Sequence, residues 1–235
     1  TACTLSFWVR KTGNDGSTVV LFADTAGHIQ FKIETNNKLR FMCHNSGGAE
    51  IVDMESTVTL TATGEWHHVM FSTNTSTDTH HLYLDGVDVA NLQNSSADTI
   101  DLTKADYGVG GVAGWGSKLH GDLADFYFTN EYINLSVASN RIKFLDANKL
   151  PVSLGSTGST PTGTAAIVYL NQNALATWHT NAGTGGGFTE NGALTAGSAV
   201  RPAGVDFGTS GSPAQVTDTP SDSADDGIGN YATWN

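Results

Sequence analysis

The sequence has few charged residues, and few of those are basic. Charged side chains make up 14% of the 235 residues, against roughly 25% in typical soluble domains. The chain has 11 Lys and Arg against 23 Asp and Glu, for a formal net charge of −12, and no basic cluster that would neutralise a row of phosphates. This composition argues against nucleic acid as a partner.

Cysteine is almost absent. Cys3 and Cys43 are the only two cysteines, which excludes a disulfide scaffold for a chain of this length. Each lies in a strand-like run. A single bridge between them stays open, and we favour buried free thiols because Cys commonly packs as a small hydrophobic side chain.

Long apolar runs and a basic-then-apolar leader are also missing. No run approaches the roughly 20 residues that are needed to cross a bilayer, so we predict no membrane insertion. The chain enters a strand-like run at Thr1. We therefore expect it to be a segment or processed form of a longer protein.

Where many proteins have charged residues, this chain is rich in Gly, Thr, Ser and Asn. These residues lie between short runs of alternating polarity. The clearest is a predicted β-hairpin between Gly64 and Gly86. Val69 and Phe71 occupy alternate positions in its first strand, and Leu82 and Leu84 do so in its second. This is the two-residue period of half-buried strands. Residues 73–79 are all Thr, Asn, Ser or Asp, which favour turns. If Ser72 faces His80 in this hairpin, His67 lies opposite Asp85.

Similar runs extend over most of the chain, with little helical signal. Strands are predicted over residues 4–10, 18–23, 28–34, 38–44, 51–54, 57–60, 121–130, 165–170 and 188–195. In residues 121–130 we expect Ala124, Phe126 and Phe128 to share one side. Residues 136–148 are the best helical candidate, for one or two turns.

Many short strands that each present one apolar face predict an all-β fold, a two-sheet antiparallel jelly-roll sandwich. We expect the sandwich to occupy residues 1–149 and a Gly/Ser/Thr-rich C-terminal arm, residues 150–200, to return and complete or cover it. Residues 201–235 have few large apolar side chains. They are predicted to be an extended linker to a further module.

Three motifs carry a family resemblance: WHHV from Trp66, LYLDG from Leu82 and GDLADF from Gly121. There the chain resembles concanavalin A-like sandwich domains of the laminin-G type, the lectin and glucanase fold. The usual strand before TLSFWV is absent. Either the arm after Thr164 fills that place or the sandwich has an open edge.

A narrower resemblance rests on LADFYFTN from Leu123, TGTAAIVYL from Thr162, and VTDTPSDS with NYATWN in the tail from Val216. These segments look like laminin-G-like parts of bacteriophage virion proteins, notably tail fibres and capsid decoration proteins. The resemblance implies a location on the surface of the virion. It also implies other virion protein chains as partners, with a homo-oligomer as an option.

One strand resembles the E-x-D-x-E motif of retaining glucanases built on this sandwich: Glu50, Asp53 and Glu55. Strict alternation would place these three carboxyl groups on one face, and the extra residue before Asp53 sends Glu50 to the opposite face unless a bulge intervenes. No Ser/His/Asp order stands out either. We predict that the chain is not an enzyme.

Two kinds of metal site were weighed. The adjacent pairs His67-His68 and His80-His81 suggest chelation, but neighbours on a strand point to opposite faces, so packed or surface histidines are favoured. Calcium is the more plausible cofactor, because related lectin sandwiches hold it with loop carboxylates and carbonyl oxygens. The candidate ligands, chosen from positions at strand ends, are Asp85, Asp88, Asp122 and Asp125.

For sugar binding, the resemblance implies aromatic faces beside polar donors, since sugars offer apolar C–H faces and a rim of hydroxyls. The candidates in loop contexts are Trp115, Tyr107, Trp178 and His179; each is equally a candidate for the core or for an assembly contact. Two functional hypotheses follow. The first is an adhesion module that binds host cell-surface glycan, and the second is a purely structural virion spacer or decoration without a ligand.

Overall fold

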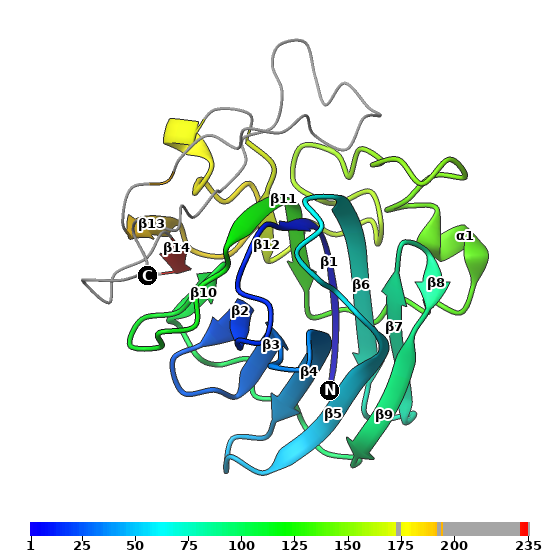
Figure 1. The fold of residues 1–235 in the computed structure, drawn as a ribbon. Coiled ribbons are helices and arrows are strands. Elements are labelled where there is room, and N and C mark those ends of the chain that lie inside the picture. Colours follow the sequence, from blue (N-terminus) through cyan, green and yellow to red (C-terminus); the bar gives the residue numbers. More distant parts are fainter. Residues whose placement is uncertain (173–174, 192–193, 195–230, 235) are drawn as a thin grey trace.

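The computed structural model describes residues 1–172, 175–191, 194 and 231–234, which form two facing antiparallel sheets (Figure 1). The predicted fold class is confirmed. The six-stranded sheet has the order β12 (Val168–Leu170), β11 (Gly121–Thr129), β1 (Ala2–Lys11), β6 (Trp66–Asn74), β7 (Thr79–Leu84) and β8 (Val87–Asp88).

The eight-stranded sheet contains most of the remaining strands. Its order is β13 (Phe188–Asn191), β14 (Tyr231–Trp234), β10 (Tyr107–Val109), β2 (Val19–Asp24), β3 (Ile29–Ile33), β4 (Lys38–His44), β5 (Glu50–Thr59) and β9 (Ala90–Ser95). The described residues add one helical turn, α1 (Ala138–Arg141), and a short 3-10 helix, η1 (Leu175–Thr177). No helix in this part of the chain is long and apolar enough to cross a membrane.

The main core lies between the two sheets and follows from alternation along the strands. Leu5, Phe7 and Val9 of β1 are fully buried in it, as the two-residue period predicts. Aromatic rings join the layers: Phe71 of β6 stacks on Phe41 of β4 with centroids 4.7 Å apart and planes 9° apart. This contact links the two sheets directly.

The central hairpin forms, but its register differs by one residue from the prediction. Ser72 lies opposite His81 and not His80, and the turn contains four residues instead of seven. Thr73 and Asn74 continue the strand because Cys3 and Ala2 of β1 pair with them on the other side. His67 still reaches Asp85, with 2.8 Å between Nδ1 and a carboxylate oxygen.

A bulge in β11 overturns the prediction that Ala124 shares a side with Phe126 and Phe128. The register with β1 shifts between Ser6 and Trp8, and Asp125 takes a φ of 49°. The extra residue reverses the alternation. Ala124 therefore packs on the outer side of the sheet, in a small cluster with Trp8 and Leu145.

The cysteines are free and buried, as favoured from the sequence. Cys3 lies on β1 and Cys43 on β4, so the two thiols come from opposite sheets and share the central core. A hydrogen bond with Cys3, together with burial, raises the pKa of Cys43 well above its usual value. The Cys43 thiol is thus protonated at neutral pH.

The arm after Thr164 reaches the sandwich edge. Val168, Tyr169 and Leu170 of β12 pair with β11, so this strand lies beside β11 at the edge of the six-stranded sheet. Most of the predicted linker, residues 201–230, lies outside the described residues. Residues 231–234 form β14 between β13 and β10.

Residues 130–167, the covering segment, give the fold a third layer. They lie on the outer face of the six-stranded sheet, which carries the large side chains of Met70, Tyr83 and Tyr127. The covering segment adds the buried residues Ile133, Leu135, Phe144, Leu154 and Ala166 to this second cluster. The helix predicted over residues 136–148 is the single turn α1, and Figure 1 shows it beside β8.

Candidate functional site

A shallow groove of about 260 Å³ opens in the covering segment. We call it the 131–162 groove. It is lined by Glu131, Tyr132, Ile133, Asn134, Asn140, Lys143, Pro161 and Thr162. Most of these side chains are polar, and Tyr132 supplies an aromatic ring.

The first wall of the groove follows from a short alternation. Ile133 and Leu135 are buried against the sheet, whereas Tyr132 and Asn134 are only half-buried. The buried hydroxyl of Thr4 on β1 donates to the carbonyl of Glu131 (2.8 Å) and accepts from the backbone N–H of Ile133 (3.0 Å). This clamp fixes the wall to a strand far away in the sequence.

Tyr132 is held in place by His81 of β7. The rings stack with centroids 6.1 Å apart and planes 20° apart, and His81 Nε2 lies 3.0 Å from the Tyr132 hydroxyl. Burial lowers the pKa of His81, so the imidazole is neutral at neutral pH. The Tyr132 side chain at the groove is therefore held in position.

The opposite wall comes from α1 and the residues that follow it. Asn140 donates to the backbone carbonyl of Asn134 (2.9 Å), and Lys143 donates to the carbonyl of Pro161 (2.8 Å). Asn140 and Lys143 are three residues apart, so they lie on one side of the turn. The lining of the groove thus includes residues with an ammonium group, amides, hydroxyls and a carboxylate.

The aromatic residues predicted to bind sugar do not share one surface. Tyr107 is 1% exposed and stacks on Phe22, with centroids 5.2 Å apart. Trp178 is fully buried in the same core. Trp115 is half-buried against the small cluster of Val20, Ala23 and Val112, and His179 is half-buried. Tyr107 and Trp178 therefore offer no ring face in this structure.

The four carboxylates predicted to bind calcium are divided between the two ends of the six-stranded sheet. Asp122 is fully buried and forms an ion pair with Arg10, and Asp125 is largely buried in the β11 bulge. Asp85 accepts from His67 and from the backbone of His68, while Asp88 is exposed.

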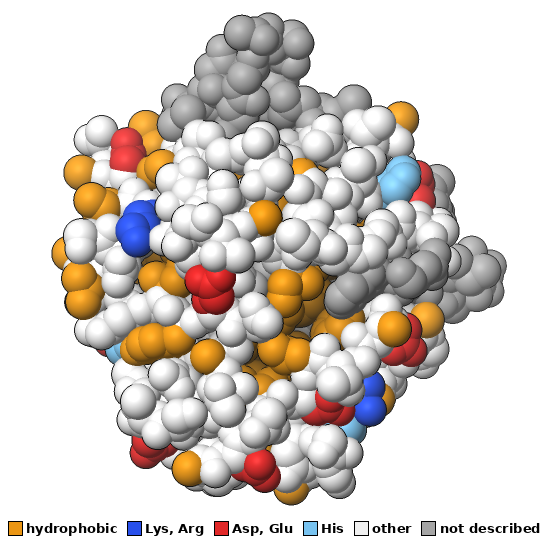
Figure 2. Space-filling view, turned by 180° about the vertical axis from the view of Figure 1, so that it is seen from behind, with side chains coloured by type: hydrophobic (Ala, Val, Ile, Leu, Met, Phe, Trp, Pro, Cys, Tyr) orange, Lys and Arg blue, Asp and Glu red, His pale blue; other side chains and the backbone are white. Residues whose placement is uncertain are grey.

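The described residues contain no group of three or more His, Cys, Asp or Glu that could hold a metal ion. Figure 2, which views the molecule from behind, shows acidic side chains as separate groups and, near its centre, a hollow in which hydrophobic side chains are visible. Calcium stays a prediction.

The three carboxylates of the glucanase-like motif lie on β5, and a bulge changes the expected placement of Glu50. The register with β4 skips Ile51, and Asn94, the cross-strand neighbour of Asp53, donates to Glu50 (3.1 Å). The bulge therefore brings Glu50 to the side of the strand that carries Asp53, contrary to strict alternation.

Asp53 and Glu55 are nevertheless paired with basic side chains in a way that opposes hydrolysis. Arg40 donates to both oxygens of Asp53, at 2.8 and 2.7 Å. A hydrogen bond from Asn36 and the ammonium of Lys38 lower the pKa of Glu55. A general acid needs a raised pKa to keep its proton, so Glu55 is poorly suited to that role.

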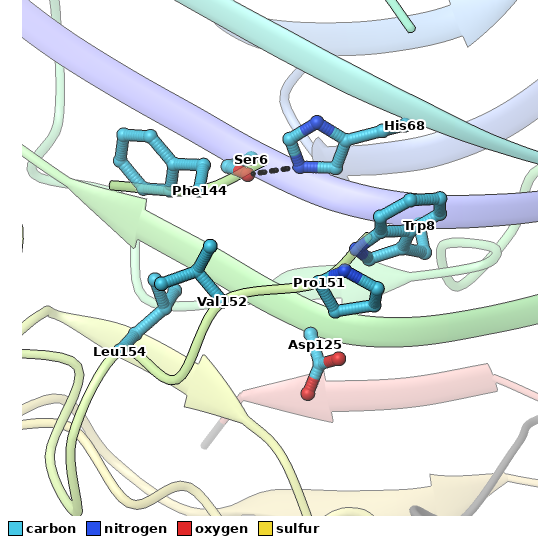
Figure 3. A pocket seen from close by; sticks show the side chains of 8 residues that line it. All are labelled: Ser6, Trp8, His68, Asp125, Phe144, Pro151, Val152 and Leu154. Atoms are coloured by element: carbon cyan, nitrogen blue, oxygen red, sulfur yellow. Dashed lines mark hydrogen bonds between the residues drawn. The ribbon is translucent and has the colours of Figure 1, made fainter. Parts of the chain in front are cut away.

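A buried Ser-His pair lies beneath the covering segment (Figure 3). Ser6 Oγ and His68 Nε2 are 2.9 Å apart, and the two residues are 2% and 1% exposed. Together with Trp8, Asp125 and Pro151 they line a cavity of about 10 Å³. This volume holds a single water at most, so the pair has no room for a substrate.

The residues of the 131–162 groove were not singled out from the sequence. The alternation of Tyr132 and Asn134 with Ile133 and Leu135 is the one local signal. It is only four residues long. The approach of Pro161 and Lys143 depends on how the whole covering segment packs.

Comparison with known proteins identifies the family. Residues 1–138, more than half of the chain, match the family model Laminin_G_3, the concanavalin A-like lectin/glucanases superfamily. The chain belongs to this family. No curated protein matches the sequence.

One solved structure shares the fold at low sequence identity. A candidate carbohydrate-binding protein from Bacteroides ovatus has a TM-score of 0.53 and 14% identity, over 72% of this chain and 45% of that one. The chain therefore spans less than half of that protein.

Two further structures have lower scores. The heptameric SAP-like pentraxin from Limulus polyphemus has a TM-score of 0.40 and 12% identity, over 57% of this chain and 66% of that one. The CBM40 module of the Ruminococcus gnavus IT-sialidase, bound to alpha2,6 sialyllactose, has a TM-score of 0.43 and 15% identity, over 57% and 78%.

Proposed function

We propose that the chain is a carbohydrate-binding module that takes a sugar residue in the 131–162 groove. The observation that carries this proposal is the pre-positioned ring of Tyr132 beside amide, ammonium and carboxylate groups. A ring face packs on the C–H groups of a sugar while hydrogen-bonding side chains take its hydroxyls. Membership of a lectin and glucanase superfamily supports the choice but does not locate a site.

The groove suits binding better than catalysis. Its volume of about 260 Å³ is close to the roughly 300 Å³ at the lower end of ligand pockets. On β5, Asp53 and Glu55 are paired with Arg40 and Lys38. The buried Ser6 and His68 are closed to substrate. We therefore propose a non-enzymatic module.

The biological setting is a further part of the proposal. The resemblance of the segments from Leu123 and Thr162 to phage virion proteins supports an adhesion module on a virion surface. Its ligand would be a host cell-surface glycan, and its neighbours would be other virion chains or further copies of this chain. Mass spectrometry of purified particles, with the chain present or absent, tests the setting independently of sugar binding.

Binding of the 235-residue chain to a glycan array tests the function. We expect Tyr132→Ala to weaken binding at least tenfold, which corresponds to about 1.4 kcal/mol. Trp115→Ala is the matched control, because Trp115 lies outside the groove in a different cluster. A loss with Trp115→Ala and none with Tyr132→Ala would move the site to the eight-stranded sheet.

The same array run with calcium and then with chelator tests the cofactor. Binding that disappears on chelation would support a calcium site that includes Asp85, Asp88, Asp122 or Asp125. Folded chain that binds no glycan in either condition would reject the proposed function and favour a structural spacer without a ligand.

A further inference from the structure

The basic side chains of this acidic chain are mostly neutralised, and the exceptions are concentrated in one segment. Six of them form ion pairs with carboxylates: Arg10, Lys11, Lys32, Lys38, Arg40 and Lys104. Among the described residues, four form no ion pair with a carboxylate: Lys118, Arg141, Lys143 and Lys149. Three of these four lie in the covering segment.

Only one of the three lines the 131–162 groove. Arg141 is occupied elsewhere: its guanidinium donates to the carbonyls of Leu135 and Ser136 and lies over the Tyr83 ring, 4.8 Å from the centroid. Lys149 is exposed at the end of a turn. Lys143 is half-buried and lines the groove.

The Lys143 ammonium is held but not neutralised. It donates one hydrogen bond, 2.8 Å long, to the uncharged carbonyl of Pro161. An ammonium has three donors, so two remain for a ligand. The bond to Pro161 also fixes the position of the charge, which reduces the entropy that a ligand must remove on binding.

We infer that the 131–162 groove binds sugars that carry an anionic group, a carboxylate or a sulfate, and that Lys143 is the residue that recognises this group. This inference rests on the proposed function and names the ligand class. Asn140, three residues earlier, also lines the groove and supplies a further polar group. A charge-assisted hydrogen bond in a partly buried site is stronger than a neutral one.

Glu131 further restricts the class of sugar that the groove would bind. Its carboxylate lines the same groove and would repel an anion placed beside it, while it accepts hydrogen bonds from sugar hydroxyls. The net charge of −12 also disfavours a dense polyanion. The groove therefore fits a single anionic sugar residue that is oriented with its charge toward Lys143 and its hydroxyls toward Glu131.

The test uses a glycan array on which uronic acid and sulfated glycans stand beside their carboxyl-reduced or desulfated counterparts. We expect the 235-residue chain to bind the acidic member of a pair at least tenfold more tightly. Lys143→Met should abolish this preference, and Lys143→Arg should retain it. Lys149→Met removes the same charge outside the groove and should have no effect.

The outcomes separate the two proposals. Equal binding of acidic and neutral members by the wild-type chain, with both lost in Tyr132→Ala, would overturn the anionic preference and keep the groove. A preference that survives in Lys143→Met would also overturn it. Binding that Tyr132→Ala leaves intact would reject the groove as the site, and no glycan binding by folded protein would reject the proposed function itself. Thermal unfolding of each variant confirms that it is folded.

Discussion

Ser6 on β1 and His68 on β6 are joined by a hydrogen bond of 2.9 Å beneath the covering segment, where both residues are almost fully buried. Burial lowers the pKa of His68 to about 3, whereas a histidine in an unfolded chain has a pKa of about 6.5. Between these two values the unfolded state binds a proton at His68 that the folded state does not bind.

This difference predicts how stability depends on pH. The contribution of His68 is fully present above about pH 6.5 and is lost as the pH falls toward 3, at up to about 1.4 kcal/mol per pH unit. We expect His68→Gln, which does not titrate, to reduce the slope of unfolding free energy against pH by about one proton. Urea unfolding between about pH 7 and pH 5 measures it.

Other histidines supply the controls for this measurement. Burial also lowers the pKa of His81, so His81 acts in the same direction, whereas the hydrogen bond with Asp85 raises the pKa of His67, which acts in the opposite direction. His67→Gln should therefore steepen the slope slightly. An identical slope in wild type and His68→Gln would refute the assignment of a neutral buried imidazole.

The ion pair between Arg10 and Asp122 predicts a large effect of one substitution. Asp122 is fully buried, so Asp122→Ala leaves the Arg10 guanidinium without its partner. We expect a loss of about 3–5 kcal/mol in the free energy of unfolding. Asp88→Ala, at an exposed position of the same sheet, should cost less than about 1 kcal/mol.

Adding a chelator tests whether Asp122 is a cation ligand and not mainly the partner of Arg10. If Asp122 serves mainly as the partner of Arg10, the chelator leaves the stability of the wild-type chain unchanged. Destabilisation by chelator that matches the effect of Asp122→Ala would instead make this carboxylate a cation ligand.

A tight contact at Gly158 predicts that the covering segment is sensitive to one added methyl group. Gly158 has a φ of 71°, and a Cβ there would lie 2.9 Å from the Ala166 Cβ and 3.2 Å from the Tyr169 ring. Gly158→Ala should therefore destabilise the protein by about 1–3 kcal/mol more than the backbone strain of an alanine at positive φ would by itself. Gly163→Ala measures the strain, because Gly163 has a φ of 89° and no neighbour within 4 Å of such a Cβ. Equal losses would show that the segment yields without cost.

The buried thiols predict a simple labelling result. Cys3 and Cys43 are free and fully buried, so neither should react with a thiol reagent while the protein is folded. Unfolding in denaturant without reductant should expose two thiols per chain, and Cys43→Ser should expose one. Rapid labelling of the native chain, or fewer thiols after unfolding, would contradict the structure.

The sandwich could be predicted because alternation is a local property. Leu5, Phe7 and Val9 face the core as their spacing predicts. The bulges at Asp125 and Ile51 and the one-residue register of the hairpin could not be predicted. They depend on hydrogen bonds between strands, and a shift of one residue moves every following side chain to the other face.

The candidate site was harder to predict because exposure is not encoded locally. Tyr107 and Trp178 have loop-like neighbours in the sequence, yet both are core residues. Tyr132 is positioned by Thr4 and by His81, which come from β1 and β7. A groove whose walls are set by such distant contacts leaves little trace in any single window of sequence.

The family model ends at residue 138, but β12 and most of the covering segment lie beyond it. The packed structure therefore extends beyond the part of the chain that the family model matches. A fragment cut at that boundary would present Met70, Tyr83 and Tyr127 to water and leave β11 as a bare edge. The covering segment and β12 therefore act as structural parts of the sandwich, although the family model does not include most of them.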